Sequence, residues 1–412
     1  MSGKWPGGFI KKTAPTVVGP TDPTLGGGSA SGIWTLDQAA DYEKQGLWPK
    51  PIVLQEMYTW GRNAYGALGL GDTTDRSNPT QVGAAGWTLA NIGTYNSNQI
   101  GAIKNDGTLW MWGANNTGQL GQGNTTNYSS PVQVGALTTW AKISTSDVPT
   151  TGTTLAIKTD GTLWAWGKNN VGQLGLGFIS YTPESSPRQV GALTDWASVS
   201  AGASATSFAI KTDGTLWNWG STALGKSGRG PGVSGVSSPV QVGTDTTWSV
   251  IICGGNNSIA LKTDNTMWTW GQGQAGRLGN GGTGNQSAPV QIGAAVWSKV
   301  SATQGAWGSA TRTDGTLWTW GRGDSGQLGV GNLTYYSSPI QVGALTTWDS
   351  PSCGDSSGGC LKTDGTIWAW GYNGNGQLGN NSTTSTSSPV QAGSDTWKSF
   401  YLNSRTSWGL KI

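Results

Sequence analysis

Side chains that could carry out acid–base or nucleophilic chemistry are few in this sequence. The 412 residues contain no histidine and only three cysteines, Cys253, Cys353 and Cys360. The lack of imidazole removes the commonest general base, the usual metal ligand and every catalytic triad that needs histidine. An enzyme of this composition would have to rely on carboxylates, lysine or tyrosine, and no pair of carboxylates stands out.

The aspartates that recur along the chain are better suited to turns than to catalysis or metal binding. Asp-Gly pairs stand between two alternating segments at Asp106, Asp160, Asp213, Asp314 and Asp364, and Asp264-Asn265 takes the same place once more. Asp-Gly is a preferred two-residue hairpin turn, and asparagine also tolerates positive φ. The sequence Gly225-Lys226-Ser227 is not a phosphate-binding loop, because the first glycine and a following helix are missing. We therefore predict no catalytic residue, no metal site, no cofactor and no enzyme activity.

Composition narrows the classes of partner. Charged residues make up 11% of the chain and the formal net charge is +3, which is too weak to predict a nucleic-acid interface. No stretch of about 18 apolar residues predicts a membrane span. No apolar segment follows the first basic residues, so we expect no signal peptide and synthesis in a cytoplasm. Cys253 and Cys353 take the repeat position of Ala201 and Ala302, which predicts small buried side chains rather than reactive thiols.

Tryptophan gives the chain its period. The motif Trp-x-Trp-Gly recurs with its second tryptophan at residues 112, 166, 219, 270, 320 and 370, and a seventh copy, Tyr58-Thr-Trp60-Gly61, begins with tyrosine. A further tryptophan opens each unit, at residues 87, 140, 196, 248, 297, 348 and 397. Such tryptophans could stack on a ligand, but a core between neighbouring units is the favoured interpretation, because one unit cannot bury them alone.

Each unit predicts a small antiparallel sheet. A tryptophan opens an alternating run, a hairpin such as 155–167 follows, and a glycine-rich stretch leads to Ser-Ser-Pro-Val-Gln-Val. Sheets of about four short strands arranged radially make a propeller. We therefore predict an all-β, seven-bladed β-propeller over residues 51–412.

The two ends of the repeat region are complementary fragments of one blade. The chain ends after a unit opening at Trp397 and a first hairpin strand, Trp408 to Ile412, while residues 51–61 supply the second hairpin strand. Pairing the two pieces would remove the open sheet edges. We expect a split closing blade with Ile412 beside the residues around Leu54.

The sequence predicts that residues 1–50 form a separate N-terminal segment that attaches to a virion or to a partner. Residues 1–32 are rich in Pro, Gly, Thr and Ser and predict an extended arm. The segment Thr35-Leu-Asp-Gln38 is a capping box, which predicts one short helix over about 36–45. Such a segment makes no core alone, so it would dock on the propeller or on a partner. The candidate anchoring residues are Trp5, Trp34, Leu36, Tyr42 and Trp48.

Departures from the repeat are the candidate surface sites. Tyr128, Tyr181, Tyr335 and Tyr336 precede the Ser-Ser-Pro element in three units and would suit sugar stacking or protein contact, or they could cap blade edges. The unit after Trp219 replaces the usual Gly-Gln-Leu-Gly with a longer loop that contains Lys226 and Arg229. Function is often grafted onto such loops, although neutral drift in a tolerant loop would look the same.

The repeats resemble those of the regulator-of-chromosome-condensation family. The segments Leu-Ala-Ile-Lys-Thr-Asp-Gly-Thr-Leu-Trp-Ala-Trp-Gly (155–167) and Gly-Gln-Leu-Gly-Leu-Gly (172–177) carry this resemblance, which covers residues 51–412. It implies a seven-bladed propeller with a split closing blade. The family includes nucleotide-exchange factors and a β-lactamase inhibitor, so the fold says little about function. The exchange factor's role on chromatin is not carried over, because neither a basic tail nor its catalytic loop can be matched here.

The N-terminal segment 31–49 looks like leaders that precede varied domains in marine bacteriophage virion proteins. This second resemblance implies a virion structural protein, acting in host recognition by a tail fibre or in surface decoration. Several copies per particle would attach to other virion proteins through residues 1–50 and bind a host glycan or protein through the propeller loops. The alternative is an intracellular regulator or inhibitor that binds a partner protein by one propeller face.

Overall fold

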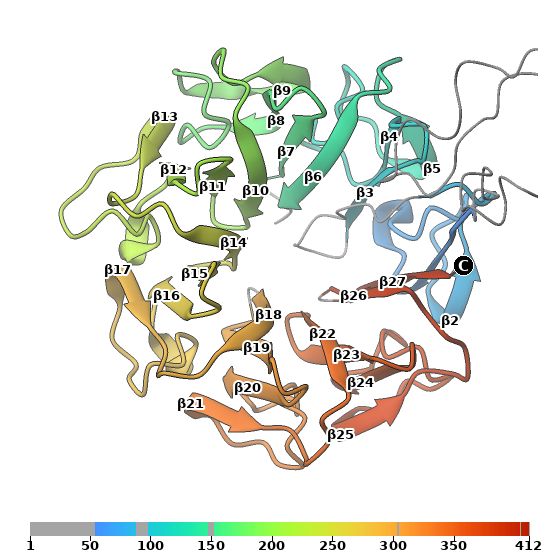
Figure 1. Cartoon of the computed structure of the whole chain (residues 1–412). Helices are drawn as coiled ribbons and strands as arrows, with labels where there is room; N and C mark the ends of the chain where they lie inside the picture. The colour runs from blue at the N-terminus through green and yellow to red at the C-terminus, as the bar shows by residue number, and fades with distance from the viewer. Residues whose placement is uncertain (1–53, 88–97, 147–151, 303–304, 404, 412) are drawn as a thin grey trace, which may run out of the picture. The chain divides into compact units, whose positions relative to one another are not determined.

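The computed structural model describes residues 54–87, 98–146, 152–302, 305–403 and 405–411. Contacts divide the chain into two units, Met1–Leu54 and Gln55–Ile412, and the account below concerns the second unit. The predicted arm, short helix and all five candidate anchoring residues lie outside the described residues. In the second unit, the described strands form seven antiparallel sheets arranged in a ring, so the predicted all-β, seven-bladed propeller is confirmed (Figure 1).

The bounds of the strands repeat from blade to blade. The closing blade contains β1 (Glu56–Gly61), β2 (Arg76–Gln81), β26 (Ser399–Leu402) and β27 (Thr406–Lys411). The next two blades contain β3 (Gln99–Ile103), β4 (Leu109–Gly113) and β5 (Tyr128–Gln133), and then β6 (Trp140–Ser146), β7 (Thr153–Lys158), β8 (Leu163–Asn169) and β9 (Ser180–Gln189). The following two contain β10 (Trp196–Gly202), β11 (Thr206–Lys211), β12 (Leu216–Gly220) and β13 (Val236–Gln241), and then β14 (Trp248–Cys253), β15 (Asn257–Lys262), β16 (Met267–Gly271) and β17 (Gln286–Gln291). The last two contain β18 (Trp297–Ala302), β19 (Trp307–Arg312), β20 (Leu317–Gly321) and β21 (Tyr336–Gln341), and then β22 (Trp348–Cys353), β23 (Ser357–Lys362), β24 (Ile367–Gly371) and β25 (Thr386–Gln391).

Helical structure among the described residues is limited to three single turns of 3₁₀ helix. These turns are η1 (Ala64–Gly66), η2 (Ala223–Gly225) and η3 (Gln274–Gly276), and each follows the third strand of its blade. No helix in the described part of the chain has the length and apolar character needed to cross a membrane.

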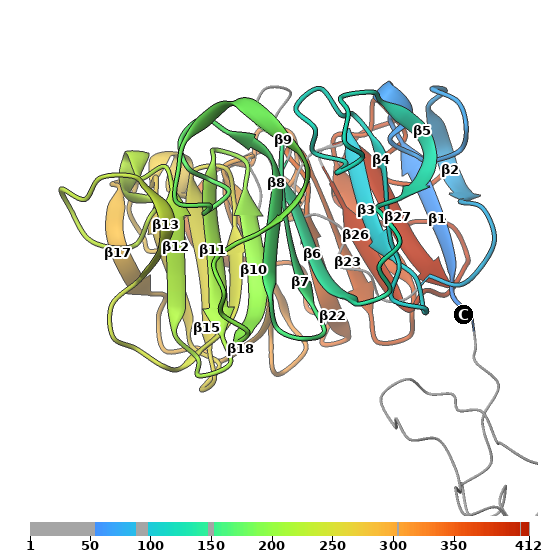
Figure 2. The ribbon, with the colours of Figure 1, turned by 90° about the horizontal axis from the view of Figure 1, so that it is seen from above.

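The first strand of each complete blade lies toward the ring axis, and the fourth strand lies at the rim (Figure 1). The strands run through the thickness of the ring, so their connections leave at two opposite faces (Figure 2). Because the strands are antiparallel, the hairpin turns and the linkers between blades share one face, and the loops between third and fourth strands share the other. We call the face with the hairpin turns and linkers the turn face, and the opposite face the loop face.

The closing blade is assembled from both ends of the described propeller. Strands β1 and β27 pair antiparallel from Glu56 with Lys411 to Gly61 with Thr406, which confirms the predicted split blade. The indole N–H of Trp60 also donates to the carbonyl of Gln377 in the preceding blade at 3.1 Å. Ile412 itself lies outside the described residues. The ring is therefore closed by strand pairing, and β1 has no free edge.

The two tryptophans of each motif differ in burial. The second tryptophan, as in Trp112 or Trp166, is fully buried, and its indole N–H donates to a carbonyl of the preceding blade, which confirms the predicted core between blades. The first tryptophan, as in Trp110 or Trp164, is only half-buried. The difference arises because the first tryptophan lies close to the turn face, where a cation from the neighbouring strand packs on its ring.

The cysteines and the hairpin turns have the predicted structural roles. Cys253, Cys353 and Cys360 are buried free thiols, and burial raises the pKa of Cys253 and of Cys353 to about 12. A thiol with so high a pKa carries little thiolate at neutral pH and is a poor nucleophile. Asn265 has a φ of 65°, the left-handed conformation expected at the Asp-Asn turn.

Candidate functional site

A chain of three side chains is repeated at the turn face of six blades. In Asp160-Gly161-Thr162-Leu163-Trp164, the Asp160 carboxylate accepts hydrogen bonds from the backbone N–H and the hydroxyl of Thr162, at 2.9 and 2.6 Å. The Thr162 hydroxyl in turn accepts a hydrogen bond from the Trp164 indole at 2.9 Å. These bonds lower the pKa of Asp160 below its usual value, the threonine hydroxyl first. Each aspartate is therefore committed to its own turn. The described residues contain no group of three or more carboxylates or thiols that could hold a metal ion.

A cation from the second strand packs between two aromatic rings in every blade. Lys158 Nζ lies 3.5 Å from the ring centroid of Trp164 and 5.2 Å from that of Trp140. Arg312 takes the same place over Trp318, and Lys262 over Trp268. What could look like seven aromatic cages for a cationic ligand is thus filled by the chain's own cations.

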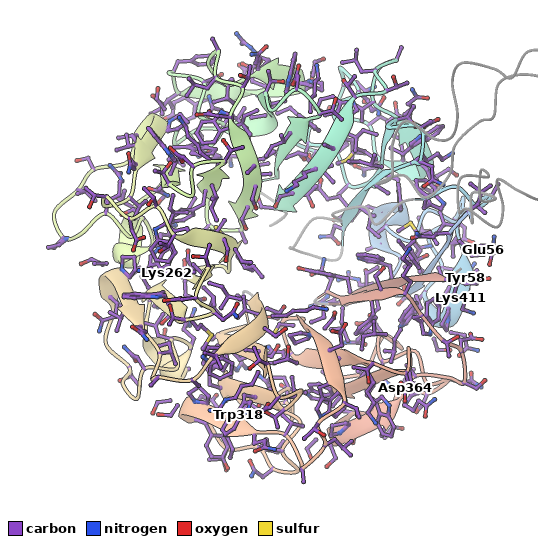
Figure 3. All side chains as sticks on the ribbon, in the orientation of Figure 1. Glu56, Tyr58, Lys262, Trp318, Asp364 and Lys411 are labelled. Atoms are coloured by element: carbon purple, nitrogen blue, oxygen red, sulfur yellow. The ribbon has the colours of Figure 1, made fainter. Side chains whose placement is uncertain are left out.

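The closing blade builds the same cluster from different residues. Glu56, two residues before Tyr58, replaces the threonine, and the Tyr58 hydroxyl donates to its carboxylate at 2.8 Å. Lys411 lies over the Tyr58 and Trp397 rings at 4.4 and 4.6 Å and forms an ion pair with Asp395 at 2.6 Å (Figure 3). Burial, and then Glu56, raises the pKa of Tyr58. Tyrosine replaces tryptophan at residue 58 because the split closing blade has no hairpin turn here, and therefore no turn threonine that could accept an indole N–H.

The candidate tyrosines lie at the loop face, but on three separate blades. Tyr128 and Tyr336 begin the outer strands β5 and β21, where they are half-buried opposite Gly113 and Gly321. Their hydroxyls accept hydrogen bonds from Asn124 and Asn332 at 3.0 and 3.1 Å. They therefore cover the ends of their blades and make no common site with one another.

Tyr335 has a different environment from its neighbour Tyr336. It is 48% exposed, and its hydroxyl donates to Asp324 at 3.0 Å. Asp324 also pairs with Arg322 at 2.8 Å, and the arginine is the main cause that lowers the pKa of Asp324. Leu333, 59% exposed, lies in the same loop.

Tyr181 belongs to the largest departure from the repeat among the described loops. Strand β9 has ten residues, whereas the fourth strands of the other blades have six, and its pairing with β8 extends to Asn169 and Ser180. Tyr181 is 88% exposed, and Ile179 and Phe178 nearby are 57% and 36% exposed. The Arg188 guanidinium lies 5.2 Å from the Phe178 ring and forms an ion pair with Glu184. We call Phe178, Ile179 and Tyr181 the hairpin patch.

The sequence analysis missed Phe178 and Ile179. Nine residues separate Gly177 from Pro187, whereas seven separate Gly123 from Pro131 in the preceding unit. This two-residue insertion, with its apolar pair Phe178-Ile179, is the signal in the sequence that marks the hairpin patch.

Lys226 does not lie on the surface. It is 5% exposed, its ammonium donates to the carbonyl of Ser204 at 2.5 Å, and burial lowers its pKa to about 8. Its backbone carbonyl still accepts the Trp270 indole at 3.1 Å, as the glutamine carbonyl does in other units. Lysine is buried here because its long side chain fills the place of the usual glutamine side chain.

Arg229 is half-buried and holds the altered loop together. Its side chain donates to the Asn218 side chain at 3.3 Å and to the carbonyl of Ser234 at 2.7 Å. Arg229 therefore stabilises its own loop, and Lys226 and Arg229 do not form the exposed basic site that the sequence suggested.

The repeats match a known family profile. The profile of the regulator of chromosome condensation (RCC1) repeat matches residues 56–93, 106–147, 160–209, 264–309, 314–361 and 364–398. The stretch 210–263, which contains Lys226 and Arg229, is not among the matched residues.

Several curated proteins are similar in sequence. The ultraviolet-B receptor UVR8 of Arabidopsis thaliana is 30% identical over 229 residues, which is 55% of this chain and 51% of the receptor. The human E3 ubiquitin-protein ligase HERC2 is 31% identical over 234 residues, but these are only 5% of that protein. The chain therefore spans about half of the first relative and a small part of the second. The mitochondrial RCC1 domain-containing protein RUG3 of Arabidopsis thaliana is 30% identical over 342 residues, 65% of this chain and 75% of RUG3.

Solved structures share the fold. Human WBSCR16 superposes with a TM-score of 0.74 at 19% identity, covering 86% of this chain and 98% of that one. Yeast RCC1 (Prp20), solved bound to Kap60, superposes with a TM-score of 0.72 at 16% identity, covering 87% and 89%. The repeat profile matches more than half of the chain, and most of the matched repeats run from the third strand of one blade to the first or second strand of the next. The chain therefore belongs to the regulator of chromosome condensation repeat family.

Proposed function

We propose that this protein is a non-catalytic regulator that binds a partner protein through the loop face of its propeller, with the hairpin patch at the centre of the interface. The observation that carries the proposal is the elongated β8–β9 hairpin, which exposes Tyr181 near the start of β9 and Phe178 and Ile179 in the loop just before it. Exposed apolar residues gathered in one place, and aromatic residues above all, are typical of protein interfaces.

Family membership supports a binding role over chemistry. The repeat family supplies a rigid ring on which partner-specific loops are mounted, and a site grafted on the fold decides the function. The ligase activity in the name of HERC2 is not proposed for this chain, which covers 5% of that protein. The repeat relatives favour the regulator alternative over the virion role, which stays a prediction based on residues 1–50.

The test is site-specific photo-crosslinking in the cell that makes the protein. A photoreactive amino acid at Tyr181 should yield one crosslinked partner. Adding the substitutions Phe178→Ser and Ile179→Ser should lower the yield of this crosslinked product at least ten-fold. The matched control places the same probe at Tyr372, which is 42% exposed in a different blade. Equal products from both positions, or none from Tyr181, would reject the hairpin patch as an interface.

A further inference from the structure

The same hollow recurs at four joints between neighbouring blades, and we call these four sites the joint hollows. Each is lined by a Gly-x or Gly-x-Gly segment and the end of the fourth strand of one blade, and by the opening tryptophan and a Ser-Pro pair of the next blade. Their volumes are about 400, 220, 410 and 450 Å³, at the joints that contain Trp140, Trp196, Trp297 and Trp348.

The walls of a joint hollow are flat and apolar. In the first hollow, Trp140 and Trp164 lie beside Pro187, and Leu137 is 46% exposed at the edge. In the fourth hollow, Trp348, Trp368 and Pro389 take the same places, and Leu345 is 47% exposed. The half-buried tryptophan is held in position by its threonine and its lysine, so the aromatic wall is preorganised before any ligand arrives.

The joint hollows carry almost no charge. Among their lining residues, the only charged side chain is Arg312, in the third hollow. Hydrogen-bonding groups are present in all four as serine hydroxyls and backbone groups. Amide side chains add to them in three hollows, namely Gln122 in the first, Asn280 and Gln291 in the third, and Asn332 and Gln341 in the fourth. A fitting ligand is uncharged, has one flat apolar face and carries polar groups at its edge.

The repetition of the joint hollows around the ring restricts the class of ligand further. The hollows lie at two pairs of adjacent joints around one ring. All four share the glycine segment, the opening tryptophan and the Ser-Pro pair, whereas a half-buried tryptophan lines the first, second and fourth hollows and Arg312 lines the third. A polymer of one repeating unit can fill several such sites, whereas a peptide of mixed sequence presents a different side chain to each. Weak binding at each site then adds up through multivalency.

We infer that the joint hollows bind hexose units of an uncharged polysaccharide. One face of a pyranose ring consists of C–H groups that pack on tryptophan, and its hydroxyls match the polar edge of the hollow. Three of the volumes lie at the low end of the roughly 300–1,000 Å³ usual for small-molecule sites, and the second hollow, at about 220 Å³, is smaller, which suits a single sugar unit. This inference does not rest on the proposed protein interface, because neither Phe178, Ile179 nor Tyr181 lines a joint hollow.

The test is affinity electrophoresis of the full chain in native gels that contain dextran, laminarin or galactomannan. We expect retardation in at least one of the three gels, reversed by the free monosaccharide at millimolar concentration. The triple variant Leu137→Ala, Leu193→Ala and Leu345→Ala removes an exposed wall from three hollows and should raise the apparent Kd at least three-fold. The matched control is Leu333→Ala, an equally conservative change at a residue that is 59% exposed and lines none of the hollows.

Three outcomes would overturn the inference. The first is an unretarded wild-type chain in all three gels, and the second is equal retardation of the triple variant and wild type. The third is stronger retardation by heparin or by a proline-rich peptide, which would assign the hollows to a charged polymer or to a peptide. Near-ultraviolet circular dichroism of the triple variant must match wild type, and the single variants replace it if it does not.

Discussion

At the scale of single residues, one position decides the backbone conformation of the turn after the third strand. It is the second residue of the segment Gly-x-Leu-Gly, or of Gly-x-Ser-Gly in one blade. Where it is glutamine, as in Gln173, its side-chain oxygen accepts the backbone N–H two residues earlier, that of Val171, at 3.0 Å. Where glutamine is replaced by Ala67, Lys226 or Arg277, the residue two places earlier adopts positive φ, at 59°, 62° and 61°. A non-glycine residue in that conformation costs about 1–2 kcal/mol. The glutamine amide thus holds the loop in a relaxed turn.

Lys226 should make stability rise with pH. Its pKa in the folded protein is lowered to about 8, whereas its ordinary value is 10.5. Between these values the unfolded chain binds a proton that the folded chain has released, so the free energy of unfolding increases with pH. Below pH 8 both states are protonated, and the cost of burying the charge is present in full.

The measurement is urea unfolding of wild type and Lys226→Met at pH 7 and pH 9.5. From pH 7 to pH 9.5 the free energy of unfolding of wild type should increase by about 2 kcal/mol relative to that of the variant, because each pKa unit represents about 1.36 kcal/mol. Arg277→Met is the matched control at the equivalent position of the next blade, because a guanidinium stays protonated throughout. Identical pH profiles for wild type and Lys226→Met would show that the buried ammonium is not the cause.

At the scale of elements, neighbouring blades are joined by two rows of hydrogen bonds. Toward the rim, the second tryptophan of each motif donates to the preceding blade, as Trp219 does to the carbonyl of Gln173 at 2.9 Å. Toward the axis, a first-strand serine accepts a backbone N–H of the next blade, as Ser200 does from Cys253 at 2.9 Å. Both donors are buried, so losing either acceptor leaves an unpaired polar group.

Ser200→Ala should therefore destabilise the joint between β10 and β14. The Cys253 N–H would lose its acceptor in a site without water access, which costs about 1–3 kcal/mol. Thermal unfolding followed by circular dichroism measures the effect. Ser298→Ala is the matched control, because Ser298 is exposed near the start of β18, and its melting temperature should stay within about 1 °C of wild type, as is usual for surface changes.

At the scale of the whole molecule, closure of the ring decides stability. The closing blade depends on β26 and β27, which supply two of its four strands. Phe400 of β26, together with Trp397 just before this strand, covers Trp60. Every described strand of the propeller lies within residues 56–411. The chain thus needs its last strands for the ring.

Two truncations test this division. Removing residues 399–412 should expose the edge of β1 and abolish the cooperative thermal transition or cause aggregation. Removing residues 1–53 should leave a cooperative transition with a melting temperature within about 5 °C of the full chain. The same second variant tests the virion prediction, because an attachment segment must be required for the chain to stay on purified particles. A cooperative, soluble protein without residues 399–412 would contradict the closure argument.

The sequence by itself determined the architecture, because the period of about 50 residues, the Asp-Gly turns and the complementary ends are local patterns that admit one closed ring. It also assigned the cysteines and the repeated aspartates to structural roles. Only the tertiary structure decided exposure. It buried Lys226, half-exposed the first tryptophan of each motif, and brought Phe178, Ile179 and Tyr181 to the surface of one long hairpin. Secondary structure is determined mainly by residues that are neighbours along the chain. The exposure of a side chain depends instead on which residues of the adjacent blade pack against it. The joint hollows likewise depend on the tertiary structure, because each is formed by residues from two neighbouring blades.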